Sequence, residues 1–206
     1  MILETSAVGS LESLQSLLCD IERCCSSPED IVVLLHFGVN SRATSLALER
    51  RAFNEADFRI PDERHYQPER QPIIPAVSSN ISTSFETSLP LAAILKRLQC
   101  QYDVQESNDA GRFVCNWIYC HSLAWSLGLC GSSSQVYRGA AKKFCHPMGP
   151  ISTILYVLVI PVQKFYSLFA HVPPFEILSV EKQLDFVRSL MLAIASELST
   201  LARPTV

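Results

Sequence analysis

Glycine is scarce in this sequence, with only 7 residues among 206, and no repeating period links them. A collagen-like or low-complexity protein is therefore excluded. The first residues lack the basic start and apolar run of a secretory signal peptide. The longest apolar run, residues 151–160, ends at Pro161 and is shorter than the roughly 20 residues of a membrane-spanning helix. We therefore expect a cytoplasmic protein that does not enter a membrane.

The sequence also lacks cysteines at the spacing of a metal site, and it has no surplus of basic residues. The eight cysteines include no C-x-x-C motif, and the formal net charge is −3. In the absence of an export signal, the thiols are expected to be reduced. We accordingly expect no metal site, no cofactor and no nucleic acid partner.

Apolar periodicity predicts that helices and strands alternate along the chain. Helices are expected over about residues 10–25, 90–98 and 179–201, with Val180 and Leu184 among the inward-facing residues of the last. Another helix is expected after residues 107–109, whose side chains are predicted to cap it, and a short one over 41–51. Continuous apolar runs predict strands over 31–37 and 166–172, and 102–105 is a shorter candidate. This alternation indicates an α/β layered fold with a mostly parallel sheet.

Three side chains are candidates for nucleophilic chemistry. Cys115 lies near the predicted start of a helix, where free N–H groups and the helix dipole favour a thiolate and can hold an oxyanion. His171 ends a predicted strand, at the edge where open α/β sheets bind ligands, and can act as general base to a thiol. Glu49, placed in the predicted helix 41–51, can orient His171.

Each candidate also has a purely structural interpretation. Cys115 can be a buried thiol, and His171 can be a core histidine bonded to the backbone. Glu49 can be a solvated carboxylate beside two arginines. The histidines at 36, 65, 121 and 146 have no accompanying pattern that indicates a function.

Three motifs together resemble those of the pyroglutamyl peptidase I (pyrrolidone carboxyl peptidase) family. They are LER at 48–50 with RIPD at 59–62, DAGRFVCN at 109–116, and FAHVPP at 169–174. They occur in the family's order, and the resemblance covers about residues 1–123 and 169–201.

The resemblance implies a three-layer α/β/α sandwich around a mixed sheet. It also implies a cysteine peptidase that removes N-terminal pyroglutamate (5-oxoproline) from peptides through a thioester and without a metal. In this scheme Cys115 is the nucleophile, His171 exchanges the proton and Glu49 orients His171. Arg59 matches a family position near the site and is assigned to substrate binding. The implied partners are pyroglutamyl peptides and further copies of the chain, because family members often form oligomers.

Two features depart from the family's pattern. The family begins with a strand and an aromatic, glycine-containing loop upstream of Ile2–Thr5, which resembles its second strand. Loss of an interior strand is expected to remove a row of ladder hydrogen bonds. Residues 124–168, which contain no acidic residue, replace a short connection and are expected to form an atypical insert in a single domain over 1–206. The apolar run Ile154–Ile160 is then expected to be an exposed, β-prone patch outside the core.

These departures suggest an incomplete or alternatively spliced product, and they leave three hypotheses. The first is a pyroglutamyl-peptidase-like enzyme. The second is a catalytically impaired relative that acts only as a binding module. The third is that residues 124–168 form a membrane-associating arm.

Overall fold

The computed structural model describes residues 1–24, 29–129, 153–162 and 164–201. The helices are α1 (Ala7–Cys24), α2 (Leu91–Leu98), α3 (Val114–Ser126) and α5 (Val180–Leu201). The main sheet contains β1 (Ile2–Leu3), β2 (Glu29–Val39), β3 (Leu46–Glu49), β6 (Val104–Ser107), β7 (Thr153–Val162) and β8 (Lys164–Val172). A second, two-stranded sheet pairs β4 (Arg51–Phe53) with β5 (Ser84–Glu86).

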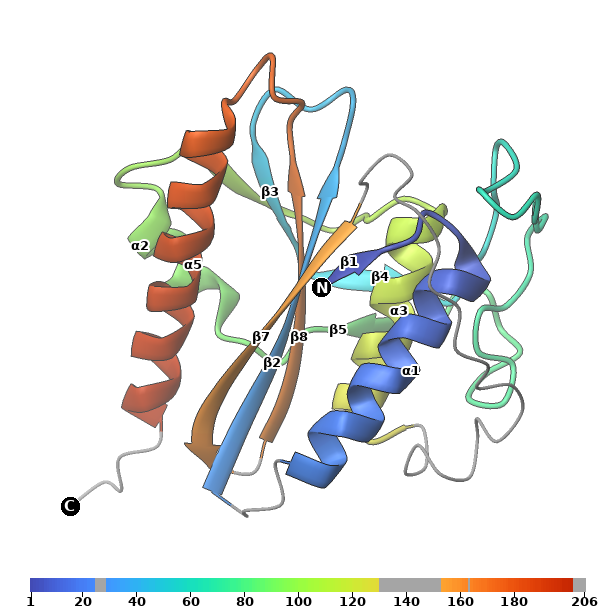
Figure 1. Ribbon diagram of the computed structural model, residues 1–206, viewed down its shortest axis with the longest axis horizontal. Helices are drawn as coiled ribbons and strands as arrows, with labels where there is room; N and C mark the ends of the chain where they lie inside the picture. Colours follow the sequence, from blue (N-terminus) through green and yellow to red (C-terminus); the bar gives the residue numbers. More distant parts are fainter. Residues whose placement is uncertain (25–28, 130–152, 163, 202–206) are drawn as a thin grey trace.

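The main sheet separates two layers of helices, with α1 and α3 on one face and α2 and α5 on the other (Figure 1). Its strand order is β1-β7-β2-β8-β3-β6. The pairings β2–β8 and β3–β6 are parallel, whereas β1–β7, β7–β2 and β8–β3 are antiparallel. The predicted three-layer α/β/α sandwich around a mixed sheet is thus confirmed.

Strand β2 lies in the interior of the sheet, as its continuous apolar run predicts. Its residues 32–35 are fully buried, because each face of the strand is covered by a layer of helices. Val32 and Leu34 join the core beneath α1 and α3, and Val33 and Leu35 join the core beneath α2 and α5. Strand β2 also pairs with β8, which carries the candidate residue His171.

The apolar run Ile154–Ile160, expected as a patch outside the core, belongs to a strand of the main sheet; the exposure of its side chains lies outside what the structure describes. The run is the middle of β7, which pairs with β2 along most of its length and with β1 at two residues. Because β7 and β8 flank β2, its ladder is paired on both sides, and the expected loss of an interior row of bonds does not occur there.

The segment 124–168 therefore supplies parts of three elements, since α3 ends at Ser126 and β8 begins at Lys164. Its residues 130–152 lie outside the described residues, and so does most of the proposed membrane-associating arm. Within the ranges that the structure describes, no helix is long and apolar enough to cross a membrane.

The predicted helix over 41–51 is also wrong, because residues 46–49 form strand β3. This strand pairs with β6 on one side and β8 on the other, and these ladders outweigh the weak local preference for a helix. Leu46 and Leu48 pack beneath α2 and α5. Since side chains alternate along a strand, Glu49 lies on the opposite face, beneath α1 and α3.

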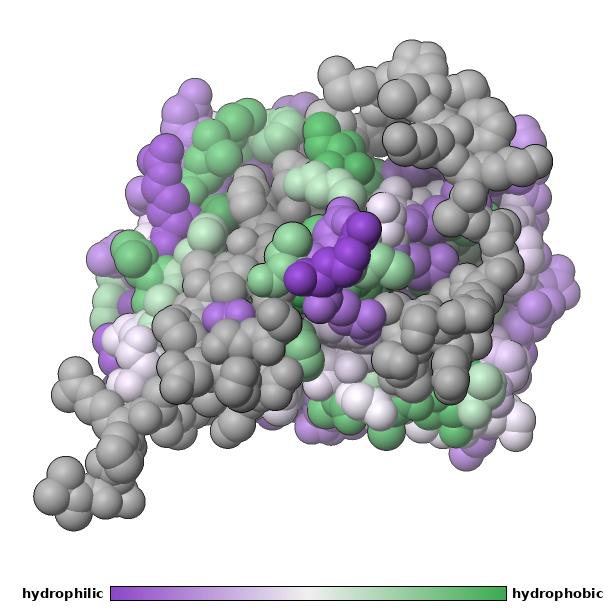
Figure 2. All heavy atoms as spheres, turned by 60° about the horizontal axis from the view of Figure 1, so that its bottom comes forward, coloured by the Kyte–Doolittle hydropathy of each residue, from purple (hydrophilic) through white to green (hydrophobic). Residues whose placement is uncertain are grey.

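The surface combines polar and apolar residues. On the face shown in Figure 2, hydrophobic residues gather in separate groups among hydrophilic ones. The exposed large apolar side chains of the described residues come from loops, as Ile60 and Phe175 do, and from helices, as Leu192 of α5 does. Scattered apolar residues of this kind are normal on protein surfaces.

Candidate active site

Three elements bring Cys115, His171 and Glu49 together on the α1/α3 side of the sheet. Cys115 is the second residue of α3, and His171 and Glu49 stand near the ends of β8 and β3. The antiparallel register pairs Ala47 with His171 and Glu49 with Phe169. Glu49 and His171 are therefore diagonal neighbours on one face, a spacing that long side chains can bridge.

A hydrogen bond joins the carboxylate to the imidazole. His171 Nδ1 lies 2.8 Å from Glu49 Oε1, and the Glu49 side chain is only 2% exposed. Within the described part of the chain, the other carboxylate oxygen, Oε2, has no hydrogen-bond partner. Burial of a charged carboxylate costs desolvation free energy unless a partner compensates for it, and the His171 ring is this partner.

The same imidazole forms a hydrogen bond with Cys115. Because Nδ1 contacts Glu49, the nitrogen that faces the thiol is Nε2. Burial lowers the pKa of His171, but the hydrogen bonds to Cys115 and Glu49 and the charges of both partners outweigh it and raise the pKa to about 10. The imidazole is therefore held in its protonated form near neutral pH, between two groups that can carry negative charge.

The local sequence explains why α3 begins so close to Cys115. Gly111 has a φ of +82°, and its N–H donates to the Asp109 carboxylate, so the chain turns immediately before the helix. Phe113 occupies the N-cap and its side chain makes no capping bond. The first N–H groups of α3 are thus left for a ligand, as helix N-termini allow. The prediction that residues 107–109 cap this helix is wrong, because α3 begins at Val114 and its N-cap is Phe113.

Asn116 fixes the start of α3 against the segment that follows β4. Its side-chain oxygen accepts from Phe53 N at 2.9 Å, and its amide donates to Phe53 O at 2.9 Å and to Glu55 O at 3.0 Å. Arg112 adds an ion pair to Glu55 and lies 4.0 Å from the centroid of the Phe53 ring. Asn116 ends the DAGRFVCN motif, and its place directly after Cys115 is the signal in the sequence for this role.

The absence of a side chain at Gly38 leaves space for the sulfur atom of Cys115. A Cβ atom on Gly38 would lie 3.1 Å from Cys115 Sγ and 2.7 Å from the Phe169 ring. Gly38 also pairs with His171 in the parallel ladder between β2 and β8. A glycine within a strand often marks such a close approach, and this signal was overlooked in the sequence.

We expect Gly38→Ala to lower the free energy of unfolding by about 1–3 kcal/mol, as overpacking in a core does. It should also slow alkylation of Cys115 by iodoacetamide, because the new methyl group displaces Sγ from His171. Denaturant unfolding and mass spectrometry of the Cys115 peptide measure the two effects. Gly9→Ala is the matched control: its Cβ would crowd Glu4 and Ser6 near the start of α1, so it should affect stability alone. Unchanged alkylation of Cys115 in Gly38→Ala would contradict the steric role.

Arg59 lies in the segment between β4 and β5. Its side chain is exposed, and no hydrogen bond or ion pair between the described residues connects it with Cys115, His171 or Glu49. Its assignment to substrate binding stays a prediction.

The other histidines do not join the site. Burial lowers the pKa of both His36 and His121 to about 3, so both rings are neutral. Neither ring has a hydrogen-bond partner among the residues that the structure describes. His36 stacks on Phe169 with ring centroids 5.9 Å apart, which is a packing contact. His65 is exposed, and His146 lies outside the described residues.

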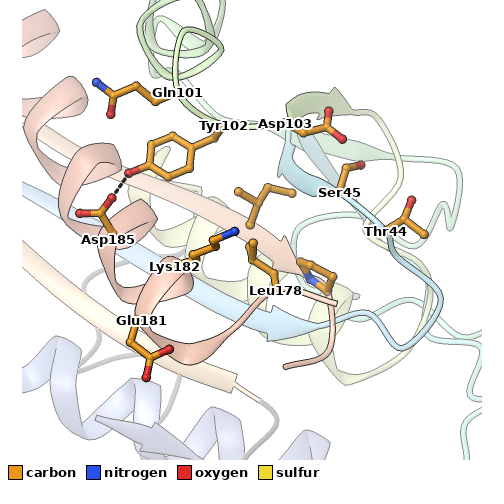
Figure 3. Close-up of a pocket in the computed structure, with 11 residues that line it drawn as sticks. Thr44, Ser45, Gln101, Tyr102, Asp103, Leu178, Glu181, Lys182 and Asp185 are labelled. Carbon is orange, nitrogen blue, oxygen red and sulfur yellow. Dashed lines mark hydrogen bonds between the residues drawn. The ribbon is translucent and has the colours of Figure 1, made fainter. Parts of the chain in front are cut away.

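A pocket of about 490 Å³ lies on the other face of the sheet, between the start of α5, the start of β3 and the turn before β6 (Figure 3). Tyr102 donates a hydrogen bond to Asp185 at its side, and Lys182 reaches toward its centre. None of the three candidate residues lines it. The pocket and the candidate active site are therefore separate.

Comparisons with known proteins give consistent results. A model of the pyroglutamyl peptidase family matches residues 16–130. The pyrrolidone-carboxylate peptidase of Bacillus cytotoxicus is 32% identical over 127 residues, which are 61% of this chain and 53% of that protein. That of Pyrococcus furiosus is 32% identical over 92 residues, 44% of this chain and 42% of that protein. The chain thus spans about half the length of these curated relatives.

The fold is also similar to solved structures. The pyrrolidone carboxyl peptidase from Thermococcus litoralis aligns with a TM-score of 0.66 at 20% identity, over 99% of this chain and 80% of that one. At this identity the similarity establishes the fold.

Proposed function

Because the chain belongs to the pyroglutamyl peptidase family, we propose that it is a cysteine-type omega peptidase that removes N-terminal pyroglutamate from peptides. The observation that carries the proposal is the hydrogen-bonded series from Glu49 through His171 to Cys115. A thiol, an imidazole and a carboxylate in this order are the groups that nucleophilic acyl transfer uses.

In the first proposed step, the thiolate of Cys115 attacks the carbonyl carbon that joins the lactam ring to the next residue. The S–C bond forms, and the carbonyl oxygen takes the negative charge. The C–N bond then breaks, and His171 gives its Nε2 proton to the leaving amine. The products are a pyroglutamyl thioester on Cys115 and the shortened peptide.

In the second step, a water molecule attacks the thioester carbonyl while the neutral His171 accepts a proton from it. The S–C bond breaks, pyroglutamate leaves as the free acid, and the thiolate–imidazolium pair is restored. The Glu49 carboxylate accepts a hydrogen bond from the Nδ1–H group of His171 in both steps and favours the charged form of the imidazole. The uncapped N–H groups at the start of α3 are the proposed donors to the oxyanion in both steps.

Hydrolysis of a pyroglutamyl aminomethylcoumarin amide by the full chain tests this proposal. We expect fluorophore release from this substrate and none from the prolyl amide, which has the same ring without the lactam carbonyl. Treatment with iodoacetamide should stop release, and circular dichroism before and after treatment controls for folding.

Absence of release from a folded preparation would overturn the enzymatic proposal. Titration with a pyroglutamyl aldehyde then identifies the alternative. No saturable binding indicates the catalytically impaired relative that has lost the ring site, whereas saturable binding without turnover indicates that the ring site is retained.

A further inference from the structure

Tyr119 lies fully buried in α3, one helical turn after Cys115. Its ring packs against Phe169, with centroids 5.7 Å apart, and is tilted against His36 at 6.4 Å. Phe169 in turn lies 4.8 Å from the His171 ring. The tyrosine therefore sits in the layer of rings directly behind the candidate active site.

The Tyr119 hydroxyl joins the two strands that carry Glu49 and His171. It donates a hydrogen bond to the backbone carbonyl of Glu49 at 2.8 Å and accepts one from the backbone N–H of Phe169. Glu49 and Phe169 are opposite each other in the last pair of the β3–β8 ladder. The hydroxyl thus spans the two strands at the point where their pairing ends.

The hydroxyl is a permanent donor. Burial, together with the nearby charge of Glu49, raises the pKa of Tyr119 well above its ordinary value of 10. The phenol consequently remains protonated at every pH at which the site can work, and its bond to the Glu49 carbonyl persists.

The separation of β3 and β8 at this point determines whether the Glu49 carboxylate reaches His171. Glu49 is the last residue of β3, so no further ladder pair holds its backbone toward β8. From these contacts we propose that Tyr119 is a positioning residue: through its hydroxyl it fixes the backbone of Glu49 against β8, and so holds the carboxylate on His171 and His171 on Cys115. For its role in turnover the inference rests on the proposed peptidase function.

Tyr119→Phe removes this hydroxyl and retains the ring. We expect kcat for the pyroglutamyl amide to fall by about 10–100-fold with KM unchanged, because a small misplacement of reacting groups costs up to about 100-fold. Alkylation of Cys115 at pH 6 should slow by about tenfold, whereas the rates at pH 10 should agree, because a misplaced imidazolium no longer favours the thiolate at low pH.

Ser122→Ala is the matched control. Ser122 also lies buried in α3 and bonds to β8, with its Oγ 2.6 Å from Ser167 Oγ, but it touches neither Glu49 nor Phe169 through a hydrogen bond in the described structure. Thermal unfolding should record a loss of stability in both variants. Only Tyr119→Phe should change kcat and the pH profile of alkylation.

Tyr119→p-aminophenylalanine offers a rescue, because its amino group also donates and accepts hydrogen bonds at this position. It should recover a large part of kcat and of the wild-type alkylation profile, and it keeps the inference testable if Tyr119→Phe does not fold. The inference would be overturned if Tyr119→Phe kept the wild-type pH profile of Cys115 alkylation, or if Ser122→Ala shifted that profile equally. It would also be overturned if Tyr119→p-aminophenylalanine recovered neither kcat nor the profile.

The alkylation experiment uses no pyroglutamyl substrate and is followed on the Cys115 peptide by mass spectrometry. A wild-type chain that does not turn over the amide, together with a shifted profile in Tyr119→Phe, would refute the proposed function and support the positioning role. If the wild type turns over the amide but the alkylation profile of Tyr119→Phe is unshifted, the proposed function is supported and the positioning role of Tyr119 is refuted.

Discussion

Replacement of Cys115 by serine is expected to reduce kcat/KM for a pyroglutamyl amide by about four orders of magnitude or more, as loss of the nucleophile does in enzymes of this type. A serine hydroxyl is a far weaker acid than a thiol, so the variant forms far less of the anionic nucleophile at neutral pH. Hydrolysis of the pyroglutamyl aminomethylcoumarin amide measures the effect.

The same substitution has a second expected result. The hydrogen bond to Cys115 is the largest of the influences that raise the pKa of His171, ahead of the bond to Glu49. With serine in place of the thiol, the pKa of His171 should fall from about 10 toward its ordinary value, because burial then opposes the charged ring with less compensation. Titration of the His171 ring by NMR measures this change.

Cys100→Ser is the control for both results. Cys100 is exposed beyond the end of α2, and its thiol contacts only the Lys96 carbonyl within the described structure. This variant should retain wild-type turnover and an unchanged His171 titration. Activity above about a hundredth of the wild type in Cys115→Ser would assign the nucleophile to another residue.

Glu49→Gln is expected to lower kcat/KM by about 100–10,000-fold, the upper figure being the loss seen when a triad aspartate is replaced by its amide. The amide keeps the shape of the side chain and removes its charge. The pKa of His171 should therefore fall, so that the ring loses its proton at a lower pH. Since the proposed mechanism needs this proton for the leaving amine, the alkaline fall in activity should move to lower pH.

Glu106→Gln is the matched control for this change. Glu106 lies on the neighbouring strand β6, opposite Leu48, and forms a half-buried ion pair with Arg50. It should affect stability slightly and leave the pH profile of turnover in place. If the activity of Glu49→Gln fell at the same alkaline pH as that of the wild type, the carboxylate would not set the charge of His171.

The sequence predicted the positions of Cys115 and His171 within their elements. Both predictions rested on strong local patterns: an apolar run that ends at a double proline in the case of His171, and a turn sequence before a helix in the case of Cys115. Such patterns succeed because the backbone alone places the residue at the end of the element.

Predictions failed where the neighbours of a segment decide its structure. The four residues of β3 are too few to show periodicity, and two partner strands make them a strand. In α5, Leu190, Ile194 and Leu198 are buried as their spacing predicts, whereas Val180 and Leu184, which the same spacing places on the inward face, are exposed. Spacing within one helix indicates its inward face, but packing on α2 and the sheet decides how far along the helix that face is covered.

The chemistry of the candidate site was thus contained in the sequence, because a thiol, an imidazole and a carboxylate are properties of residue types and do not depend on the fold. Their contact was decided by tertiary structure alone. It depends on the antiparallel register of β3 and β8, on the missing side chain of Gly38 beneath the sulfur, and on the buried hydroxyl of Tyr119. These are relations between residues far apart in the chain, and only close packing of the whole fold holds them at hydrogen-bonding distance.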